Sequence, residues 1–379
     1  MRWMIDGISE IKQQGCEQRK RLQWRQIQDK LFTINRRSLA LNQTEEAGGI
    51  CINELTNIII VIITATAVID GNLTLGMMLA TQNVIGQLRG PIEDIMDMAY
   101  QWQDVKISLE RTDEIYDMDD EETPQRHITT VTNMNIRLEH VSFKYDRMKE
   151  TNILDDISIE IPQGRVTAIV GTSGSGKTTL AKLILDQYAP LEGSIYVGST
   201  RLENINLTWW RQQCGAVMQD GKLFEESIAQ NIALGYDEID TSRIEYAARM
   251  ANISNDINQL PMGFDTILYQ GGQNLSNGQR QRLLIARAIY RMPRLFVFDE
   301  ATHSLDTNNE IAIVNNLQEV FQGKTVVLIA HRLSTVLHAD NIVVLHNGHI
   351  AEQDTHQELI LHQGLYYKLV RNQLAIETD

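Results

Sequence analysis

Apolar and polar positions follow different patterns in three regions of the chain. Residues 1–49 are mostly polar and basic, residues 50–118 carry long apolar stretches, and residues 137–379 alternate short β-branched runs with helix-like runs. The last pattern predicts βαβ units, and therefore an α/β domain built on a mainly parallel sheet. The acidic segment Asp117–Pro124 ends in proline and predicts a linker over residues 119–136.

The apolar region predicts two long helices. Ile50–Ile69 is the most apolar stretch, and the turn Asp70–Asn72 separates it from a second, moderately apolar stretch. We expect helices over about residues 30–69 and 73–118, within a helical region that covers residues 1–118. The first helix would be about 60 Å long at 1.5 Å per residue, twice the hydrocarbon thickness of a bilayer. Hydropathy alone fits a buried core helix equally well.

Charge favours a membrane for these helices. Basic residues flank the two apolar stretches, but the turn between the stretches carries none. This is the positive-inside pattern of a helical hairpin that crosses a lipid bilayer with its tip outward. Glu54 would then face other helices or a wet cavity rather than lipid. The flanking basic residues are Lys12, Arg19, Lys20, Arg21, Arg25, Lys30, Arg36, Arg37, Arg89, Lys106 and Arg111.

Composition excludes several classes of protein. The chain has 379 residues, 43% of them apolar and 22% charged, so a sizeable core can form. Its net charge of −15 argues against a nucleic-acid partner, because phosphate contacts need clustered Lys and Arg. The cysteine spacing fits neither a disulfide framework nor a zinc site. The first residues lack the apolar core of a signal peptide, and we expect the chain to be a piece of a longer protein.

A phosphate-binding loop follows a predicted strand, Val166–Val170. The segment Gly171–Thr178 matches G-x-x-x-x-G-K-[ST], and a helical run follows it. In such a loop, glycines let successive backbone N–H groups point at phosphate oxygens, Lys177 reaches the β and γ phosphates, and Thr178 offers its hydroxyl to Mg²⁺. The predicted ATP-binding residues here are Gly171, Thr172, Ser173, Gly174, Ser175, Gly176, Lys177, Thr178 and Thr179.

An acidic pair ends a second predicted strand. The run Leu295–Phe298 is apolar, and Asp299 and Glu300 follow it. Such a strand carries Asp299 to the phosphate edge of the sheet, where it would hold Mg²⁺. Glu300 is placed to polarise the attacking water as a general base. An isolated acidic pair is more often a solvated strand end, but the upstream phosphate loop favours the catalytic interpretation.

The segment Leu275–Arg282, between these two motifs, resembles the LSGGQ signature of the ATPases of ABC transporters. The resemblance implies an ABC nucleotide-binding domain over residues 137–379. It further implies that Tyr145 stacks on adenine, that Gln219 touches Mg²⁺ or the attacking water, and that His331 contacts the γ-phosphate. With Glu300, the last two would be the catalytic residues.

The resemblance also implies a partner. In this family the signature caps the phosphate loop of a second subunit, so that two ATP molecules lie between two copies arranged head to tail. The residues that would contact nucleotide in this way are Ser276, Gly278, Gln279 and Asp306. This chain departs from the family at Asn277, where glycine is usual, and the role of that position stays open.

The N-terminal third resembles ABC exporters. Residues 8–17 are similar to the cytosolic stretch after the fourth membrane helix of an exporter subunit, which implies a coupling helix at about residues 16–25. The two long helices would be the fifth and sixth of that subunit. The implied protein is a homodimer in the bacterial inner membrane, with its ATPase domains in the cytoplasm.

A narrower resemblance concerns the transported substrate. Four segments are similar to peptidase-containing ABC transporters, which export bacteriocins and related peptides: Leu73–Ala80, Trp209–Arg211, Met218–Gly221 and Gly271–Leu275. ATP-driven peptide export is therefore predicted, and a lipid or drug-like substrate stays open. A soluble, non-transporting ABC ATPase is disfavoured by the apolar hairpin, an importer by the helices on the same chain, and a non-catalytic regulator by the presence of Lys177, Glu300 and His331.

Overall fold

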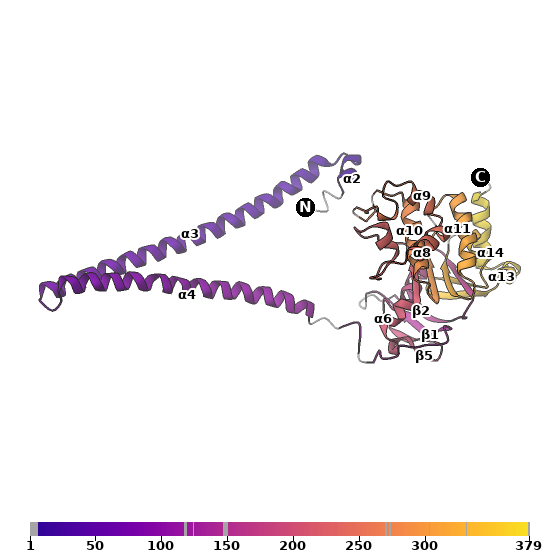
Figure 1. The fold of residues 1–379 in the computed structure, drawn as a ribbon, viewed down its shortest axis with the longest axis horizontal. Helices are drawn as coiled ribbons and strands as arrows, with labels where there is room; N and C mark the ends of the chain where they lie inside the picture. Colours follow the sequence, from indigo (N-terminus) through magenta and orange to yellow (C-terminus); the bar gives the residue numbers. More distant parts are fainter. Residues whose placement is uncertain are drawn as a thin grey trace. The chain divides into compact units, whose positions relative to one another are not determined.

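The computed structural model forms two compact units, Met1–Asp119 and Asp120–Asp379, and each is described by itself. The expected division into a helical region and an α/β domain is confirmed (Figure 1). The structure describes residues 7–116, 120–123, 125–146, 151–269, 271–272, 274–302, 304–330 and 332–377.

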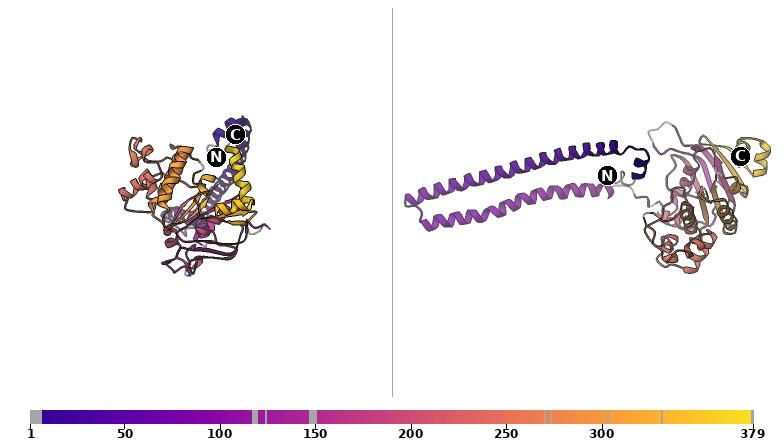
Figure 2. Two further views of the ribbon diagram at one scale, coloured as in Figure 1. Left: turned by 90° about the vertical axis from the view of Figure 1, so that its right-hand side faces the viewer. Right: turned by 90° about the horizontal axis from the view of Figure 1, so that it is seen from above.

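The first unit is a helical hairpin preceded by one short helix. Helix α2 spans Ile8–Gln13, α3 spans Glu17–Ile69, and α4 spans Leu75–Tyr116. Helices α3 and α4 lie side by side next to the turn that joins them, where Thr64 is buried (Figures 1 and 2). Two long helices are thus present, but α3 begins at Glu17 rather than near residue 30, and α4 continues through Pro91 without a break.

The segment predicted as the coupling helix, about residues 16–25, is helical and continuous with α3, and its coupling role stays a prediction. Residues 17–25 form the first turns of α3, and the helix continues after Arg25 up to Ile69. The separate short helix lies earlier, at α2, and the turn Gln14–Gly15 divides it from α3. Gly15 adopts φ +58°, a left-handed conformation that costs glycine little and breaks the helix there.

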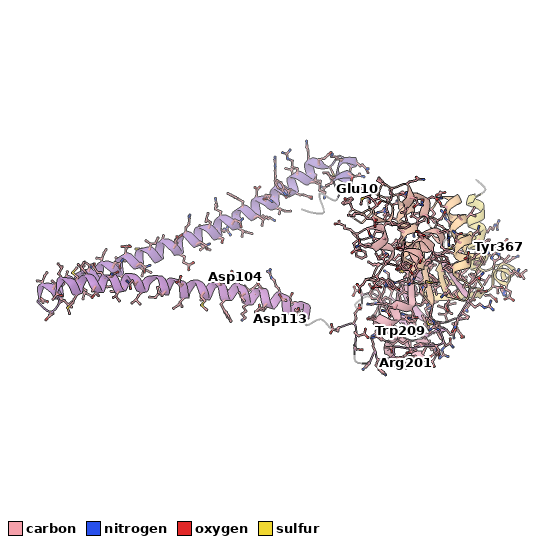
Figure 3. The ribbon with its side chains drawn as sticks, viewed as in Figure 1. Glu10, Asp104, Asp113, Arg201, Trp209 and Tyr367 are labelled. Carbon is pink, nitrogen blue, oxygen red and sulfur yellow. The ribbon has the colours of Figure 1, made fainter. Side chains whose placement is uncertain are left out.

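Apolar side chains of the hairpin are exposed. Ile59, Ile62 and Ile63 on α3 are 55%, 60% and 61% exposed. Within α3 an 18-residue window reaches a mean hydropathy of 1.9 and is only 6% buried; among the described residues this is the one helix that is long and apolar enough to cross a membrane. On α4, acidic side chains such as Asp104 and Asp113 project from the half farther from the turn (Figure 3).

The second unit contains a six-stranded sheet with the order β10-β9-β3-β8-β7-β6. All neighbouring strands are parallel except the antiparallel pair β9 and β10. The predicted strands at Val166–Val170 and Leu295–Asp299 are confirmed as β3 and β7. The strands are β3 Val166–Gly171, β6 Cys214–Val217, β7 Leu295–Asp299, β8 Thr325–Ile329, β9 Asn341–His346 and β10 His349–Asp354.

A four-stranded antiparallel sheet, ordered β2-β1-β4-β5, packs on the first sheet. Its strands are β1 Ile136–Phe143, β2 Leu154–Ile161, β4 Glu192–Val197 and β5 Thr200–Arg201. The remaining helices are α5 Lys177–Ile184, α6 Leu207–Gln213, α7 Ile228–Ile232, α8 Thr241–Met250, α9 Ser254–Asn258, α10 Asn277–Tyr290, α11 Thr307–Val320, α12 Leu333–Val336, α13 His356–His362 and α14 Leu365–Glu377, with 3-10 turns η1 Leu202–Asn204 and η2 Gly263–Asp265.

Both faces of the six-stranded sheet are covered, which explains why its inner strands β3, β7, β8 and β9 are apolar without alternation. On one face, Val297 packs in a core shared with the second sheet and with Leu180 of α5. On the other face, Phe296 and Phe298 pack against α7, α8, α10 and α11. Helices α13 and α14 cover the part of the sheet near Val170.

The ordered α/β unit begins earlier than the predicted boundary at residue 137. Arg126 pairs with Asp186 through both carboxylate oxygens, and both side chains are largely buried. Ile128 forms a β-bridge with Ile205, and Met134 is buried in the core. The predicted linker covered residues 119–136. Its second half is therefore part of the domain, because its few apolar residues pack against the domain.

Candidate functional site

The phosphate loop curls from the end of β3 to the start of α5. Three of its residues, Gly171, Gly174 and Gly176, have φ of +154°, +79° and +101°. A Cβ on Gly171 would lie 2.1 Å from the carbonyl oxygen of Leu345 on the neighbouring strand β9. Only glycine fits that close approach, so the loop has the tight backbone path that its sequence predicts.

The rim of the loop is open to solvent. Thr172, Ser173 and Gly174 are exposed, and the N-terminus of α5 has no side-chain cap. The first N–H groups of a helix need an acceptor, and together with the helix dipole they attract an anion. The hydroxyl of Ser175 is buried and has no hydrogen-bond partner among the described residues. These groups form a cradle that suits phosphate.

Lys177 closes the loop from inside. Its Nζ donates hydrogen bonds of 3.0 Å to the carbonyl oxygens of Gly171 and of Thr172. Burial lowers the pKa of Lys177, while the nearby charges of Glu300 and Asp299 raise it. The ammonium group therefore sits among carbonyl and carboxylate oxygens and needs little movement to meet a phosphate.

Asp299 ends β7 at the same sheet edge. Strands β3, β8 and β7 are parallel neighbours, with Asp299 in register with Ile329, so their carboxyl ends meet where the loop begins. Asp299 is fully buried, and burial raises its pKa, whereas the adjacent Thr178 hydroxyl and Lys177 lower it. The predicted convergence of loop and acidic pair is present in the fold.

The acceptor chemistry at Asp299 fits a hard cation. Neither carboxylate oxygen receives a hydrogen bond of good geometry from the described residues, although the Thr178 hydroxyl is close enough to influence the pKa. A buried, unsatisfied carboxylate next to a hydroxyl suits Mg²⁺. In the described part of the chain, no group of three His, Cys, Asp or Glu gathers, so a cation here would need further ligands from nucleotide and water.

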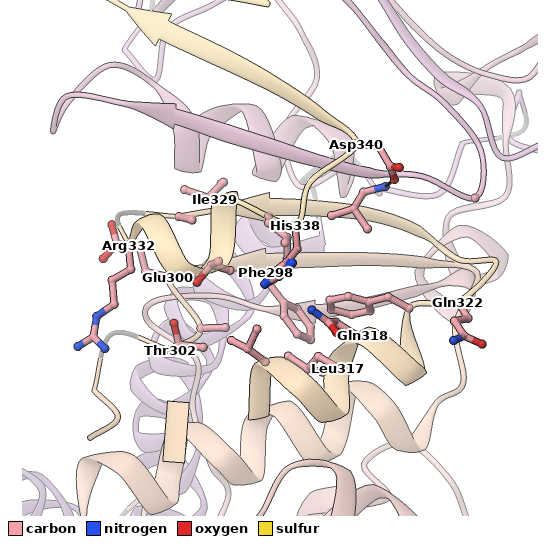
Figure 4. Close-up of a pocket in the computed structure, with 18 of the residues that line it drawn as sticks. Phe298, Glu300, Thr302, Leu317, Gln318, Gln322, Ile329, Arg332, His338 and Asp340 are labelled. Carbon is pink, nitrogen blue, oxygen red and sulfur yellow. Dashed lines mark hydrogen bonds between the residues drawn. The ribbon is translucent and has the colours of Figure 1, made fainter. Parts of the chain in front are cut away.

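Glu300 sits on a strained backbone beside a cavity. Its φ is +51°, in the left-handed region that non-glycine residues rarely adopt, and its N–H donates to the carbonyl oxygen of Ile329. Its side chain lines one end of a cavity of about 450 Å³, together with Thr302 and Arg332 (Figure 4). Strain of this kind occurs often at functional positions.

Two glutamines approach Glu300 from other elements. Nε2 of Gln219, two residues after β6, lies 3.5 Å from Oε2 of Glu300. Nε2 of Gln281, on α10, lies 3.5 Å from the backbone oxygen of Glu300. Gln219 and Glu300, each predicted from the sequence to act at the attacking water, thus lie close together. Gln281 was not predicted, and the only signal was its place one turn after the signature Gly278.

The signature segment starts helix α10. The Ser276 hydroxyl accepts from the N–H of Gln279, and the Gln279 side chain accepts from the N–H of Ser276, which makes a capping box. Gln279 also donates to Asp256, at 2.8 Å. A Cβ on Gly278 would lie 3.3 Å from the oxygen of Ser304. In this single chain, Ser276 and Gln279 thus hold the helix end in shape.

Tyr145 and Asp306, also predicted from the sequence, have printed contacts with residues other than the acidic pair. Tyr145 is 47% exposed, and its hydroxyl lies 3.3 Å from that of Thr179. Asp306 caps α11, and hydrogen bonds from Asn309 lower its pKa. The oxygen of Asn277 accepts from Arg280. His331 lies outside the described residues.

Comparisons with known proteins agree with this site. A family model described as ABC transporter matches residues 154–303. The toxin RTX-III translocation ATP-binding protein of Actinobacillus pleuropneumoniae is 39% identical over 311 residues, which are 82% of this chain and 43% of that protein. The leukotoxin translocation ATP-binding protein LktB of Mannheimia haemolytica is also 39% identical over 311 residues, 44% of its length. The chain spans less than half the length of these curated relatives.

A solved structure extends the similarity to the helices. A bacterial Atm1-family ABC exporter with ATP bound is 31% identical, with a TM-score of 0.88, over 98% of this chain and 65% of that one. The relatives named here are toxin translocation proteins, and the narrower resemblance to peptidase-containing exporters stays a prediction. Residues 154–303 are an ABC transporter ATPase domain, and the chain is an ABC-type ATPase with a long helical region before that domain.

Proposed function

We propose that this chain powers export of a polypeptide across the bacterial inner membrane by hydrolysing ATP between two of its copies. The observation that carries the proposal is the gathering of Lys177, Asp299 and Glu300 at one sheet edge, on the same chain as an apolar helical hairpin. The ATPase domain would lie in the cytoplasm.

Each residue of the site has a separate task in this proposal. The glycine-lined loop and Lys177 bind the phosphates, and Tyr145 supports adenine. Thr178 and Asp299 would hold Mg²⁺, with Gln219 as a further oxygen ligand, and the bound ion would neutralise charge on the phosphates. Glu300 takes a proton from the attacking water, and His331 contacts the γ-phosphate.

The second copy supplies the other half of the sandwich. Ser276 and Gly278 stand at the N-terminus of α10, where a hydroxyl and backbone N–H groups meet the phosphates of the facing subunit. Asp306 lies near the signature through the contact of Gly278 with Ser304. ATP then favours the closed pair, and its hydrolysis removes that preference. Motion would pass to the membrane helices through the segment at about residues 16–25, the first turns of α3.

The hairpin crosses the bilayer in this proposal, with its turn outside. We expect an Asn72→Cys variant, in which Cys16 and Cys51 are serine, to react with a membrane-impermeant maleimide in intact spheroplasts. Asn72 is exposed in the turn and carries no basic neighbour. The matched control is Arg25→Cys, an exposed position on the basic side of α3, which should react only after the cells are opened. Equal protection of both positions in intact cells would place the hairpin inside the cytoplasm.

The substrate is a peptide or protein in this proposal. Relatives named for the translocation of RTX-III toxin and of leukotoxin support a polypeptide, and the sequence segments similar to bacteriocin exporters support it as well. A lipid or drug-like substrate is the competing candidate, and both classes would use the same ATPase site.

A secretion experiment separates these classes. Glu300→Gln is introduced into the chromosomal gene of the source bacterium, and culture supernatants are compared by mass spectrometry. We expect at least one polypeptide to disappear from the medium and to accumulate in the cells. The reason is that loss of a general base lowers the rate of ATP hydrolysis by a factor of about 10² to 10⁴. Glu319→Gln, a surface change on α11, is the control. An unchanged set of secreted polypeptides, with altered efflux of a lipid or drug, would refute polypeptide export.

A further inference from the structure

Tyr145 does not stand alone at the end of β1. Its ring centroid lies 5.0 Å from that of Phe143 and 5.2 Å from that of Tyr188, and it meets both rings nearly at right angles, 88° and 84°. The centroids of Phe143 and Tyr188 are 5.6 Å apart. Phe143 is buried, whereas Tyr145 and Tyr188 are 47% and 43% exposed. The three rings form a cluster with an open side.

Tyr188 comes from a different part of the fold, the loop after α5. That loop is held against β1, since the N–H of Leu191 donates to the oxygen of Ser142 at 2.8 Å. Its first residue, Asp186, has φ +54° and pairs with Arg126. The backbone on both sides of Tyr188 is therefore fixed, and its ring is presented to Tyr145 by the scaffold rather than by chance.

A second contact ties Tyr145 to the phosphate loop. Its hydroxyl lies 3.3 Å from the hydroxyl of Thr179, which is 5% exposed and follows Thr178 on α5. The Tyr145 ring is thus held by the ring of Tyr188, and its hydroxyl is held by Thr179 of α5. A side chain held in this way loses little further freedom when a base stacks on it, which improves binding.

We propose that Tyr188 is a positioning residue for the nucleobase: it holds the Tyr145 ring in the orientation that receives adenine. This inference rests on the proposed placement of adenine at Tyr145. Perpendicular aromatic pairs at this separation are favoured by the ring quadrupoles, so removing Tyr188 frees Tyr145 to turn. The bland alternative is that Tyr188 only covers the apolar core beside Phe143, in which case it would affect stability and not base recognition.

The two roles differ in one measurable ratio. Tripolyphosphate occupies the phosphate loop but has no base, so the ratio of ATP affinity to tripolyphosphate affinity isolates the contribution of adenine. Both affinities are measured by calorimetry on the full chain in detergent, with Mg²⁺ present, and thermal melting is recorded for each variant. The variants are Tyr145→Ala, Tyr188→Ala, Tyr188→Leu and Tyr188→Phe.

We expect Tyr145→Ala to lower the ratio about tenfold or more, the effect of losing a base-stacking ring. Tyr188→Ala and Tyr188→Leu should lower it about fivefold, and Tyr188→Phe, which keeps the ring, should restore it to within about twofold. Tyr188→Leu keeps an apolar side chain over the core, so it preserves the test if the alanine variant folds poorly.

Three results would overturn the inference in different ways. An unchanged ratio in both Tyr188→Ala and Tyr188→Leu, with a lowered ratio in Tyr145→Ala, leaves adenine at Tyr145 and removes the role of Tyr188. An unchanged ratio in Tyr145→Ala places adenine elsewhere, and the proposed base site fails together with the inference. Equal losses of ATP and tripolyphosphate affinity in the Tyr188 variants would assign that residue to the whole loop and would also reject the proposal.

Discussion

In the Glu300→Gln variant, ATP hydrolysis falls about a thousandfold, the middle of the range for a lost general base, while ATP still binds. Glutamine keeps the shape of the side chain and can still accept from Gln219, so the site around it is preserved. The amide cannot take a proton from water. With hydrolysis stopped, ATP-bound pairs of the chain should accumulate. Phosphate release gives the rate, and light scattering with and without ATP gives the mass.

Glu319→Gln is the matched control, because it makes the same chemical change at an exposed position of α11. Its rate should equal that of the unmodified chain. A Glu300→Gln variant that hydrolyses ATP at the normal rate would reject the general-base role. A variant that is inactive and also fails to bind ATP would instead assign Glu300 to the binding site.

Lys177→Ala should weaken ATP binding about a hundredfold, as expected when charge-assisted hydrogen bonds to two phosphates are lost. The ammonium group already lies among oxygens of the loop, held by Gly171 and Thr172, so a phosphate displaces these acceptors without a large rearrangement. Binding of ATP and of tripolyphosphate should fall together, because the lysine contacts only the phosphates.

Lys182→Ala controls for the loss of a positive charge from the same helix. Lys182 also influences the pKa of Asp299, but it lies on the last turn of α5, away from the loop. We expect ATP affinity to change by no more than about threefold in this control, the scale of a partly solvated charge. Retained ATP affinity in Lys177→Ala, at an unchanged melting temperature, would contradict the role of the loop.

Some elements could be predicted from sequence because their signals are local. The glycines of the loop and Lys177 occur at fixed spacing between a β-branched run and a helical run, so strand, loop and helix identify one another. The end of α3 at Ile69 was predictable from the uncharged run and the Asp-Gly-Asn turn that follows it. The buried strand before Asp299 was equally predictable. Both faces of its sheet are covered, so its sequence is a continuous apolar run.

Other features depend on contacts between distant residues and left little trace in the sequence. Arg126 was predicted to lie in the linker. Its pairing with Asp186, 60 positions later in the sequence, places it in the domain. Gln281 and Tyr188 reach the site from α10 and from a loop, through packing that no short motif encodes. The start of α3 at Glu17, rather than near residue 30, was also not predicted, and the coupling role of residues 16–25 stays a prediction.

The left-handed backbone at Glu300 sets activity and stability against each other at one residue. A side chain with a Cβ costs roughly 1–2 kcal/mol in that conformation, and glycine would relieve it. Replacement of Glu300 by glycine would therefore relieve the backbone, at the loss of the Gln219 contact and of the proposed general base, and would leave a folded domain that does not turn over ATP. A glutamate that persists at residue 300 is therefore a mark of selection for turnover, and a copy of this gene released from that selection should lose the acid before it loses the fold.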